Sequence, residues 1–237
     1  MFWNVGCQLV ALNFQTLDLG MQLNQGKFEY NNRSGYLLKP EIMRRTDVNK
    51  LFDPFAESPL DGIVASTLKI KIISGMFLNI TRNENEKRIG TTITVELFGL
   101  PADSARSQKA HRVKASTTNM FNVIYSDTGF TFKKIIMPQL ALLKISVFDE
   151  QNKLIGHRVL PIVGLRPGYR YISLKNESNQ PINMYCIFVH MQLHDYVPEE
   201  YEEFANALVN PINYVTSLSK KDEMLKTLAD ENEVISF

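Results

Sequence analysis

The feature that most constrains this chain is an alternation of apolar and polar side chains in short segments between residues 64 and 196. "TLKIKIIS" places Leu68, Ile70 and Ile72 on one side and lysines on the other, and "TTITVELFG" repeats the pattern. A period of two residues is typical of a half-buried β-strand. Further strand candidates are "KAHRVKA", "GFTFKKIIM", "ALLKISVFD", "LIGHRVLP", "YRYISL" and "MYCIFVHMQLH". Strands at this spacing, separated by polar turns, predict an antiparallel β-sandwich over residues 64–196.

Residues 1–45 predict a different architecture. The nearly all-apolar run from Val5 to Leu12 is typical of a strand that is covered on both faces. A helix-compatible run follows within residues 16–35, and "GYLLKP" is a second apolar strand. Strand, helix and strand form a βαβ unit, the building block of parallel α/β sheets. Two such strands cannot cover themselves, so we expect the unit to belong to a larger α/β structure.

The remaining segments predict a linker and a helical extension. Residues 46–63 are polar and contain prolines, whereas residues 197–237 begin with glutamates after Pro198, which suit the first turn of a helix. Asn210 is expected to cap a second helix that begins at Pro211, which predicts a helix-turn-helix. The apolar faces of the two helices are predicted to consist of Tyr201, Phe204, Leu208, Ile212, Val215, Leu218, Leu225 and Leu228.

The overall composition narrows the function. The formal net charge of +1 argues against a strongly basic nucleic-acid binder, and 44% hydrophobic residues are enough to build a core. The two cysteines, Cys7 and Cys186, lie in apolar runs far apart and are predicted to be buried free thiols. We expect neither a secretion signal nor a membrane-spanning segment, because no stretch has the required pattern or apolar length.

No motif predicts a self-contained hydrolase, nucleotide-binding or zinc site. His190 and His194 are four residues apart, but the flanking alternation predicts a strand, on which they would lie about 13 Å from each other. The acids of "FDEQNK" are candidate calcium ligands, yet the loop "MFLNITRNENEKRIG" mixes Lys87 and Arg88 with its glutamates. We therefore expect no cofactor or metal in this chain.

The segment "SARSQKAHRVK" collects Arg106, Lys109, Arg112 and Lys114. One interpretation is attraction to an anionic membrane surface, where each nearby base adds about 1 kcal/mol of binding. An equally good interpretation is that the charges keep an edge strand from pairing with other chains. The sequence leaves both interpretations open.

Several long blocks resemble the phosphoinositide-specific phospholipase C family, and within it the beta class. The blocks are the first 45 residues, "FDPF", "DGIVA", "ISGMFL", "ELFGLPAD", "LIGHRVLP", "RPGYRYISL" and "DYVP". The resemblance implies that residues 1–45 end the second half, or Y half, of a split TIM-type (β/α)8 barrel. It further implies that residues 46–63 are a linker, that residues 64–196 are a C2 domain, and that residues 197–237 begin a C-terminal extension.

The resemblance also implies an activity, namely hydrolysis of phosphatidylinositol 4,5-bisphosphate to diacylglycerol and inositol trisphosphate, with Ca²⁺ bound in the barrel. It places the catalytic, calcium-ligating and phosphate-binding groups upstream of the position that matches Met1, so no catalytic or metal residue is assigned to this chain. The C2 loops depart from those of calcium-binding relatives near Arg88 to Gly90, whereas Asp149 keeps an acid. This resembles the calcium-independent C2 domain of the beta class.

A specific partner is implied by "ALVNPINYV", which resembles the segment that binds an activated G-protein alpha subunit of the q class. The resemblance assigns this contact to Leu208, Asn210, Pro211 and Ile212, and extends it to the linker around Asp61. From the residues alone, Leu208 and Ile212 could instead pack on the sandwich.

Together these observations predict the C-terminal part of a phospholipase C that works only with its upstream catalytic half. We expect a cytoplasmic protein that is peripheral at the inner face of the plasma membrane and has no nucleic-acid partner. One alternative is a truncated, non-catalytic adaptor that binds a G protein or a membrane. Another is a C2-like membrane-targeting module in an unrelated protein.

Overall fold

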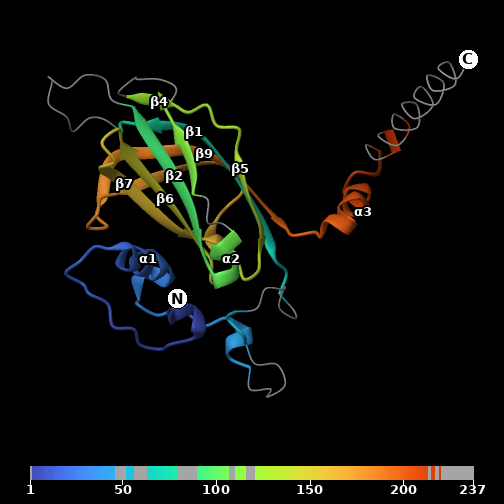
Figure 1. The fold of residues 1–237 in the computed structure, drawn as a ribbon, viewed down its shortest axis with the longest axis horizontal. Helices are drawn as coiled ribbons and strands as arrows, with labels where there is room; N and C mark the ends of the chain where they lie inside the picture. Colours follow the sequence, from blue (N-terminus) through green and yellow to red (C-terminus); the bar gives the residue numbers. More distant parts are fainter. Residues whose placement is uncertain are drawn as a thin grey trace, which may run out of the picture. The chain divides into compact units, whose positions relative to one another are not determined.

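The computed structural model describes residues 2–45, 52–55, 63–78, 90–106, 110–115, 121–212, 215–216 and 219. The chain divides into two compact units, Met1–Tyr196 and Val197–Phe237. The first unit contains an antiparallel sheet and a segment docked against it, and the second begins with a helix (Figure 1). The two units are considered separately below.

Among the described residues, the sheet of the first unit has nine strands, and all paired neighbours run antiparallel. Its order is β3-β2-β6-β7-β8-β9-β1-β4, with β5 also paired to β1. The strands are β1 (Ser66–Met76), β2 (Thr91–Phe98), β3 (His111–Lys114), β4 (Asn122–Ile124), β5 (Phe130–Ile135), β6 (Leu142–Asp149), β7 (Leu154–Pro161), β8 (Gly168–Lys175) and β9 (Pro181–Asp195).

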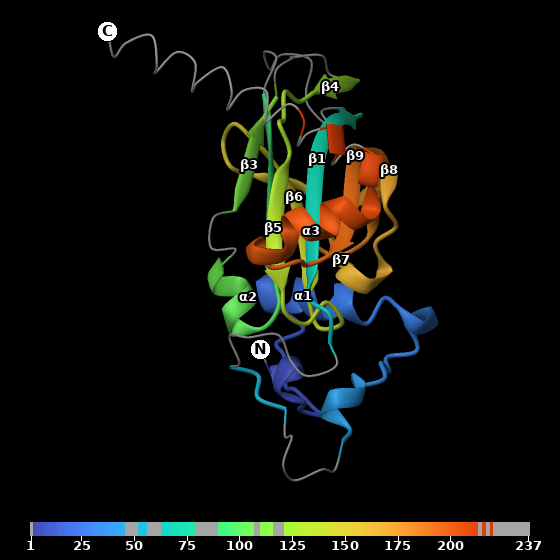
Figure 2. The ribbon, with the colours of Figure 1, turned by 90° about the vertical axis from the view of Figure 1, so that its right-hand side faces the viewer.

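The sheet folds over between β7 and β8, where a single residue pair, His157 with Lys175, joins the two strands. Two layers result, one formed by β3, β2, β6 and β7 and the other by β8, β9, β1, β4 and β5. Figure 2 shows β5, β1, β9 and β8 side by side in the second layer. The antiparallel sandwich predicted from the sequence is therefore confirmed.

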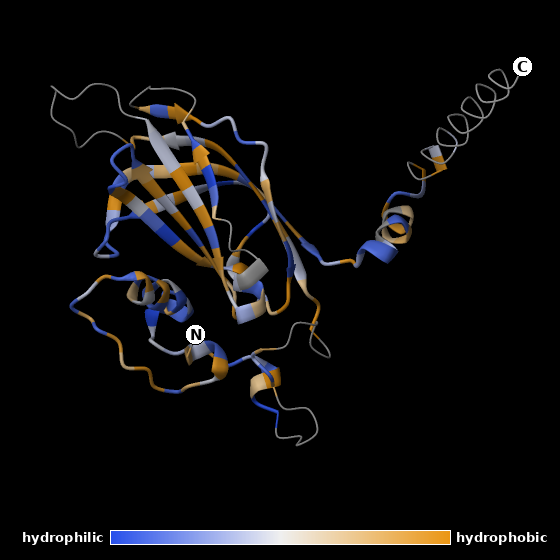
Figure 3. Ribbon diagram, viewed as in Figure 1, coloured by the Kyte–Doolittle hydropathy of each residue, from blue (hydrophilic) through white to orange (hydrophobic). Residues whose placement is uncertain are grey.

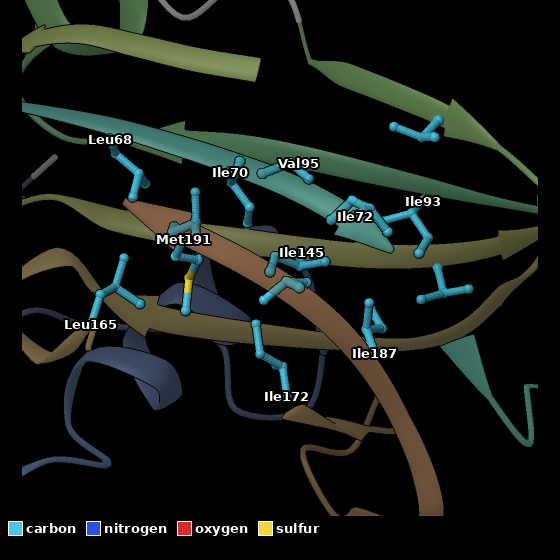
Figure 4. Close-up of a cluster of buried hydrophobic side chains, with 14 of the residues drawn as sticks. Leu68, Ile70, Ile72, Ile93, Val95, Ile145, Leu165, Ile172, Ile187 and Met191 are labelled. Carbon is cyan, nitrogen blue, oxygen red and sulfur yellow. The ribbon is translucent and has the colours of Figure 1, made fainter. Parts of the chain in front are cut away.

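The core lies between the two layers and is built from every second residue of each strand. Figure 3 shows the resulting alternation of apolar and polar residues along the strands. In Figure 4, Ile70 from β1, Ile93 from β2 and Ile145 from β6 point into the same cluster, and each is fully buried. Burying a side chain of this size contributes about 1.5–3 kcal/mol, so the period-two pattern supplies the main stabilising term.

The eight predicted strands correspond to all strands except β4, which the sequence analysis missed. β4 has three residues and only Val123 is buried, so its alternation is too short to detect. The described structure also contains α2 (Pro101–Arg106), a short helix that was not predicted. Proline in the first turn suits this helix because its missing N–H group is not needed there.

The strands predicted in residues 1–45 are not present. Val5 to Leu12 contains the end of a 3-10 helix (Phe2–Val5) followed by irregular chain, and Leu9 is 92% exposed. "GYLLKP" is irregular as well. A strand requires a hydrogen-bonding neighbour, and no strand of the described chain pairs with either segment. For the same reason Cys7 is exposed rather than buried, although it is a free thiol as predicted.

The predicted helix of this segment is present as α1 (Leu19–Lys27). It begins where the Asp18 side chain accepts a hydrogen bond from the Met21 backbone N–H group at 2.8 Å, a typical N-cap. Figure 1 shows α1 next to the layer that contains β6 and β7, and its contacts are with these two strands. Gly26 allows this approach, because a Cβ atom there would lie 2.4 Å from Cβ of Val159.

A smaller apolar cluster closes one end of the sandwich. Its buried members are Leu100, Ile136, Met137 and Leu140. The partly buried side chains that pack against it come from α2 and from chain segments before β1, and they are Ile42, Met43, Phe52, Ile63 and Ala102. Two residues of the predicted linker, Phe52 and Ile63, are thus fixed on the sandwich.

The second unit contains α3 (Glu199–Val209), the first of the two predicted helices. Beyond Asn210, the described residues Pro211, Ile212, Val215, Thr216 and Ser219 are again helical. The hydroxyl of Thr216 donates to the backbone oxygen of Ile212 at 2.9 Å, a one-turn contact. Three residues of the predicted apolar face of the second helix lie outside the described residues, namely Leu218, Leu225 and Leu228.

Candidate functional site

The best-defined polar site is the joint between the N-terminal segment and the sandwich, centred on Glu29. Oε2 of Glu29 lies 2.9 Å from Nζ of Lys175, and Oε1 lies 3.2 Å from Nη2 of Arg158. Arg33 is a third, more exposed partner at 3.4 Å. The side chains of Glu29 and Lys175 are only 15% and 7% exposed, so this ion pair is largely screened from water.

The environment of Glu29 favours its charged form. Burial alone would raise the pKa of its carboxyl group, but the hydrogen bond from Lys175 and the positive charges of Arg158, Lys175 and Arg33 hold the pKa below its ordinary value. The charge of the buried Lys175 is therefore balanced by a residue that lies outside the sandwich strands. Because an unpaired buried charge is costly, sandwich and N-terminal segment depend on each other at this point.

The sheet surface beneath α1 is polar. Cross-strand pairing aligns Thr94, Ser146, His157 and Lys175 on one outward face, and all four are buried. Burial, together with the positive charges of Lys144, Lys175 and Arg158, lowers the pKa of His157 to about 4, so its imidazole is neutral at neutral pH. These four side chains offer little apolar surface to α1. The ion pairs of Glu29 therefore contribute to holding the N-terminal segment on this face.

Further contacts hold the N-terminal segment together and to the sandwich. The indole of Trp3 donates to Oδ1 of Asn24 at 3.1 Å and packs edge-on against the ring of Phe28. The side chain of Asn4 donates to the backbone oxygen of Gly99 at 2.9 Å. The segment is thus connected to the first layer at both β7 and the end of β2.

The residues assigned to G-protein binding have an exposed, helical setting where the structure describes them. Leu208 ends the apolar face of α3 and is 68% exposed, and Ile212 is 81% exposed. Asn210 is the non-helical residue between α3 and the helical Pro211. Phe204 and Tyr201, one and two turns before Leu208, are exposed as well. Asp61 lies outside the described residues, whereas nearby Phe55 is 60% exposed.

The predicted basic group is only partly described. Arg106 ends α2, Lys109 lies outside the described residues, and Arg112 and Lys114 are exposed on β3. In the described part of the chain β3 pairs with β2 alone and is an edge strand, which leaves both interpretations of the basic group open. Register places Arg112 beside Thr94, on the outer face where α1 docks two strands away.

The acids considered as calcium ligands have structural partners. Oδ1 of Asp149 accepts hydrogen bonds from the backbone N–H groups of Gln151 and Lys153 at 2.9 and 2.8 Å. Oε1 of Glu150 accepts one from Gly90 at 2.7 Å. Within the described ranges no three His, Cys, Asp or Glu side chains are grouped closely enough to hold a metal ion. Most of the opposite loop, residues 79–89, lies outside the described residues.

The histidines follow the strand interpretation. His190 and His194 both lie on β9, where they pair with Lys71 and Thr67 of β1. Cys186, on the same strand, is a free, partly buried thiol. No helix of the described residues is both long and apolar enough to span a membrane.

Sequence reasoning missed the Glu29 joint completely. Glu29 and Arg158 are 129 residues apart, and neither belongs to a recognisable motif. One signal was available, namely that a histidine of β7 and a lysine of β8 alternate with residues of the predicted apolar face. Buried ionisable residues require a partner, but the sequence does not say which one.

Comparison with known proteins identifies the chain. The Y domain of phosphatidylinositol-specific phospholipase C matches residues 1–42. A 1-phosphatidylinositol 4,5-bisphosphate phosphodiesterase of classes I and II from Drosophila melanogaster is 52% identical over 235 residues, 99% of this chain and 17% of that protein. The beta-1 phosphodiesterase of Bos taurus is 51% identical over 236 residues, 99% of this chain and 19% of that protein.

A solved structure shows the same fold. The crystal structure of L. pealei PLC21 superposes with a TM-score of 0.75 and 46% sequence identity, over 84% of this chain and 24% of that one. The chain therefore belongs to the phosphoinositide-specific phospholipase C family, with the end of the Y domain followed by a C2 domain. Relatives named beta-1 and beta-4 place it with the beta class of that family. The chain spans less than a fifth of the length of the two relatives compared above.

The Glu29 joint yields a stability prediction. Glu29→Gln leaves Lys175 buried without its counter-charge and is expected to lower the free energy of unfolding by about 3 kcal/mol. Glu41→Gln is the matched control, because Glu41 is 74% exposed in its pair with Arg45 and should contribute less than about 1 kcal/mol. Urea denaturation followed by circular dichroism measures both. If both substitutions lower the free energy of unfolding by the same small amount, the Glu29 ion pairs do not stabilise the protein as predicted.

Proposed function

We propose that this chain is the C-terminal part of a beta-class phosphoinositide phospholipase C. The complete enzyme hydrolyses phosphatidylinositol 4,5-bisphosphate to diacylglycerol and inositol trisphosphate in G-protein-coupled signalling. The observation that supports this most is sequence identity of about half over 99% of the chain to phosphodiesterases of that name. The Y-domain match at residues 1–42 and the fold shared with PLC21 agree with it.

In this proposal the chain contributes support and binding, whereas the catalytic groups lie upstream. Ca²⁺ belongs to the barrel of the complete enzyme, and its ligands are upstream residues. Hydrolysis of this kind needs a positioned acid and base at the phosphate. The described residues 2–45 contain no histidine and hold their one buried acid, Glu29, in ion pairs with Arg158 and Lys175. They are suited to attaching the barrel to the C2 domain.

The second proposed role is capture of an activated G-protein alpha subunit of the q class. Leu208, Asn210, Pro211 and Ile212 are the proposed contact, with Asp61 of the linker as an additional one. Two exposed apolar side chains on either side of an Asn-Pro turn suit an anchor that enters an apolar groove. Packing of Leu208 and Ile212 on the sandwich is the competing interpretation.

The third proposed role is peripheral association, from the cytoplasm, with the anionic inner face of the plasma membrane. Exposed bases of the C2 domain support it, since each one near the surface adds about 1 kcal/mol. The group predicted from the sequence consists of Arg106, Lys109, Arg112 and Lys114. If the upstream half is not made together with this chain, the alternative is a non-catalytic adaptor with the same two binding roles.

Reconstitution tests the first proposal. We expect the purified chain alone to leave phosphatidylinositol 4,5-bisphosphate in mixed vesicles intact, and the chain together with the separately expressed upstream half of the family enzyme to release inositol trisphosphate. The upstream half alone is the control. Turnover by this chain unaided, or no turnover by the combined halves although they bind each other, would contradict the proposal.

A substitution in the extension tests the G-protein contact. Ile212→Glu places a charge in the proposed apolar anchor and is expected to weaken binding of the activated alpha subunit at least about tenfold, or 1.4 kcal/mol. Ile124→Glu is the matched control, because Ile124 is an exposed isoleucine of β4 in the other unit. Calorimetric titration measures both. If Ile212→Glu binds the alpha subunit with unchanged affinity, the proposed contact through the extension is wrong.

A further inference from the structure

The outer face of the second layer combines tyrosines with lysines. Figure 2 shows this layer, with β1, β9 and β8 side by side. Register places Lys71, His190 and Tyr169 in one row across the three strands, and Phe188 beside Tyr171 in the next. The tyrosine–lysine face is defined by Lys69, Lys71, Tyr169, Tyr171, Phe188 and His190.

The aromatic half of this face is preorganised. The ring of Tyr169 lies 4.6 Å from that of His190 and is stacked on Phe188 at 5.7 Å. The ring of Tyr171 lies 4.6 Å from Phe188 on its other side. Despite these contacts Tyr169 and Tyr171 are 63% and 66% exposed. The rings thus hold each other in place while leaving most of their surface to solvent.

The charged half of the face is positive. Lys69 and Lys71 are exposed, and neither forms an ion pair with a carboxylate in the described part of the chain. The positions of β1, β8 and β9 that face outward contain no Asp or Glu between Thr67 and Ile73, Tyr169 and Ser173, or Cys186 and His194.

This composition fits a lipid surface better than a protein. Protein interfaces are depleted of lysine, whereas anionic lipid headgroups attract it. Tyrosine is enriched where a protein meets the headgroup region, because its ring is apolar and its hydroxyl group is polar. The positive charge of the exposed Lys69 and Lys71 is also complementary to an anionic bilayer surface.

We infer that the tyrosine–lysine face is the surface with which the C2 domain lies on an anionic bilayer. This rests on the proposed membrane association, but it assigns that association to the layer opposite β3. Arg112 and Lys114 share their outer face with the docked α1, which lies between that face and any flat surface. The main contacts of α1 are with β7 and β6, which belong to the other layer.

Vesicle binding of the full chain tests the inference. Sedimentation with phosphatidylcholine vesicles, with and without phosphatidylserine, is expected to show binding that requires phosphatidylserine. The double substitution Lys69→Gln and Lys71→Gln should weaken it about thirtyfold. Tyr169→Ser with Tyr171→Ser should weaken it as well, and should leave the dependence on salt unchanged. All four side chains are exposed, and near-ultraviolet circular dichroism verifies that the variants are folded.

The matched control removes the same charge from the other layer. Arg112→Gln with Lys114→Gln is expected to change vesicle binding by less than about twofold. If this control loses vesicle binding while Lys69→Gln with Lys71→Gln retains it, the inference is wrong. The chain then binds the membrane through Arg112 and Lys114 of β3. If the unsubstituted chain does not bind phosphatidylserine vesicles, the proposed membrane association itself fails, and the inference fails with it.

Discussion

The structure depends on the carboxylate of Glu29, which forms ion pairs with both Lys175 and Arg158 where β7 meets β8. This is the point at which the ladder folds over from one layer to the other, through the single pair His157 and Lys175. A lysine that is 7% exposed in its side chain requires a counter-charge, and that charge arrives from the N-terminal segment. The turn between layers and the docking of α1 are therefore stabilised together.

This joint gives the Y-domain end a rigid support. Gly26 lets α1 approach Val159, and the Asp18 cap sets where the helix begins. The residues around them form no strands of their own, although they match the end of a barrel domain in sequence. In the proposed enzyme the C2 domain would hold this end of the barrel in position, while its other layer stays available for the membrane.

The sandwich could be predicted because its information is local. The alternation of apolar and polar residues along β1, β2 and six further strands follows from burial of one face of each strand. β4 was not predicted, because a strand of three residues is too short to show this alternation. The prediction of strands near Val5 and Leu38 was wrong. An apolar run indicates that a segment can be buried, but it does not show which part of the protein would cover it. Leu9, 92% exposed, shows an apolar sequence without a partner.

The candidate sites also differ in how far a local sequence pattern could predict them. Exposure of Leu208 and Ile212 agrees with a contact that a motif predicts, because the Asn-Pro turn is a local feature. The basic group could be found as a cluster in sequence, and one interpretation placed it on an edge strand, but the outer face that Arg112 shares with the docked α1 could not be predicted. The Glu29 ion pairs and the tyrosine–lysine face join residues that are more than a hundred apart in the first case and on three different strands in the second. Neither leaves a pattern in the sequence.

The most direct measurement of the central claim is hydrogen–deuterium exchange of the backbone amides of α1 in the full chain. If α1 and the sandwich form one cooperative unit, these amides exchange as slowly as those of β7, because a helix of this length is unstable alone. Fast exchange throughout α1, with β6 and β7 still protected, would show that the N-terminal segment is not docked and would contradict the account.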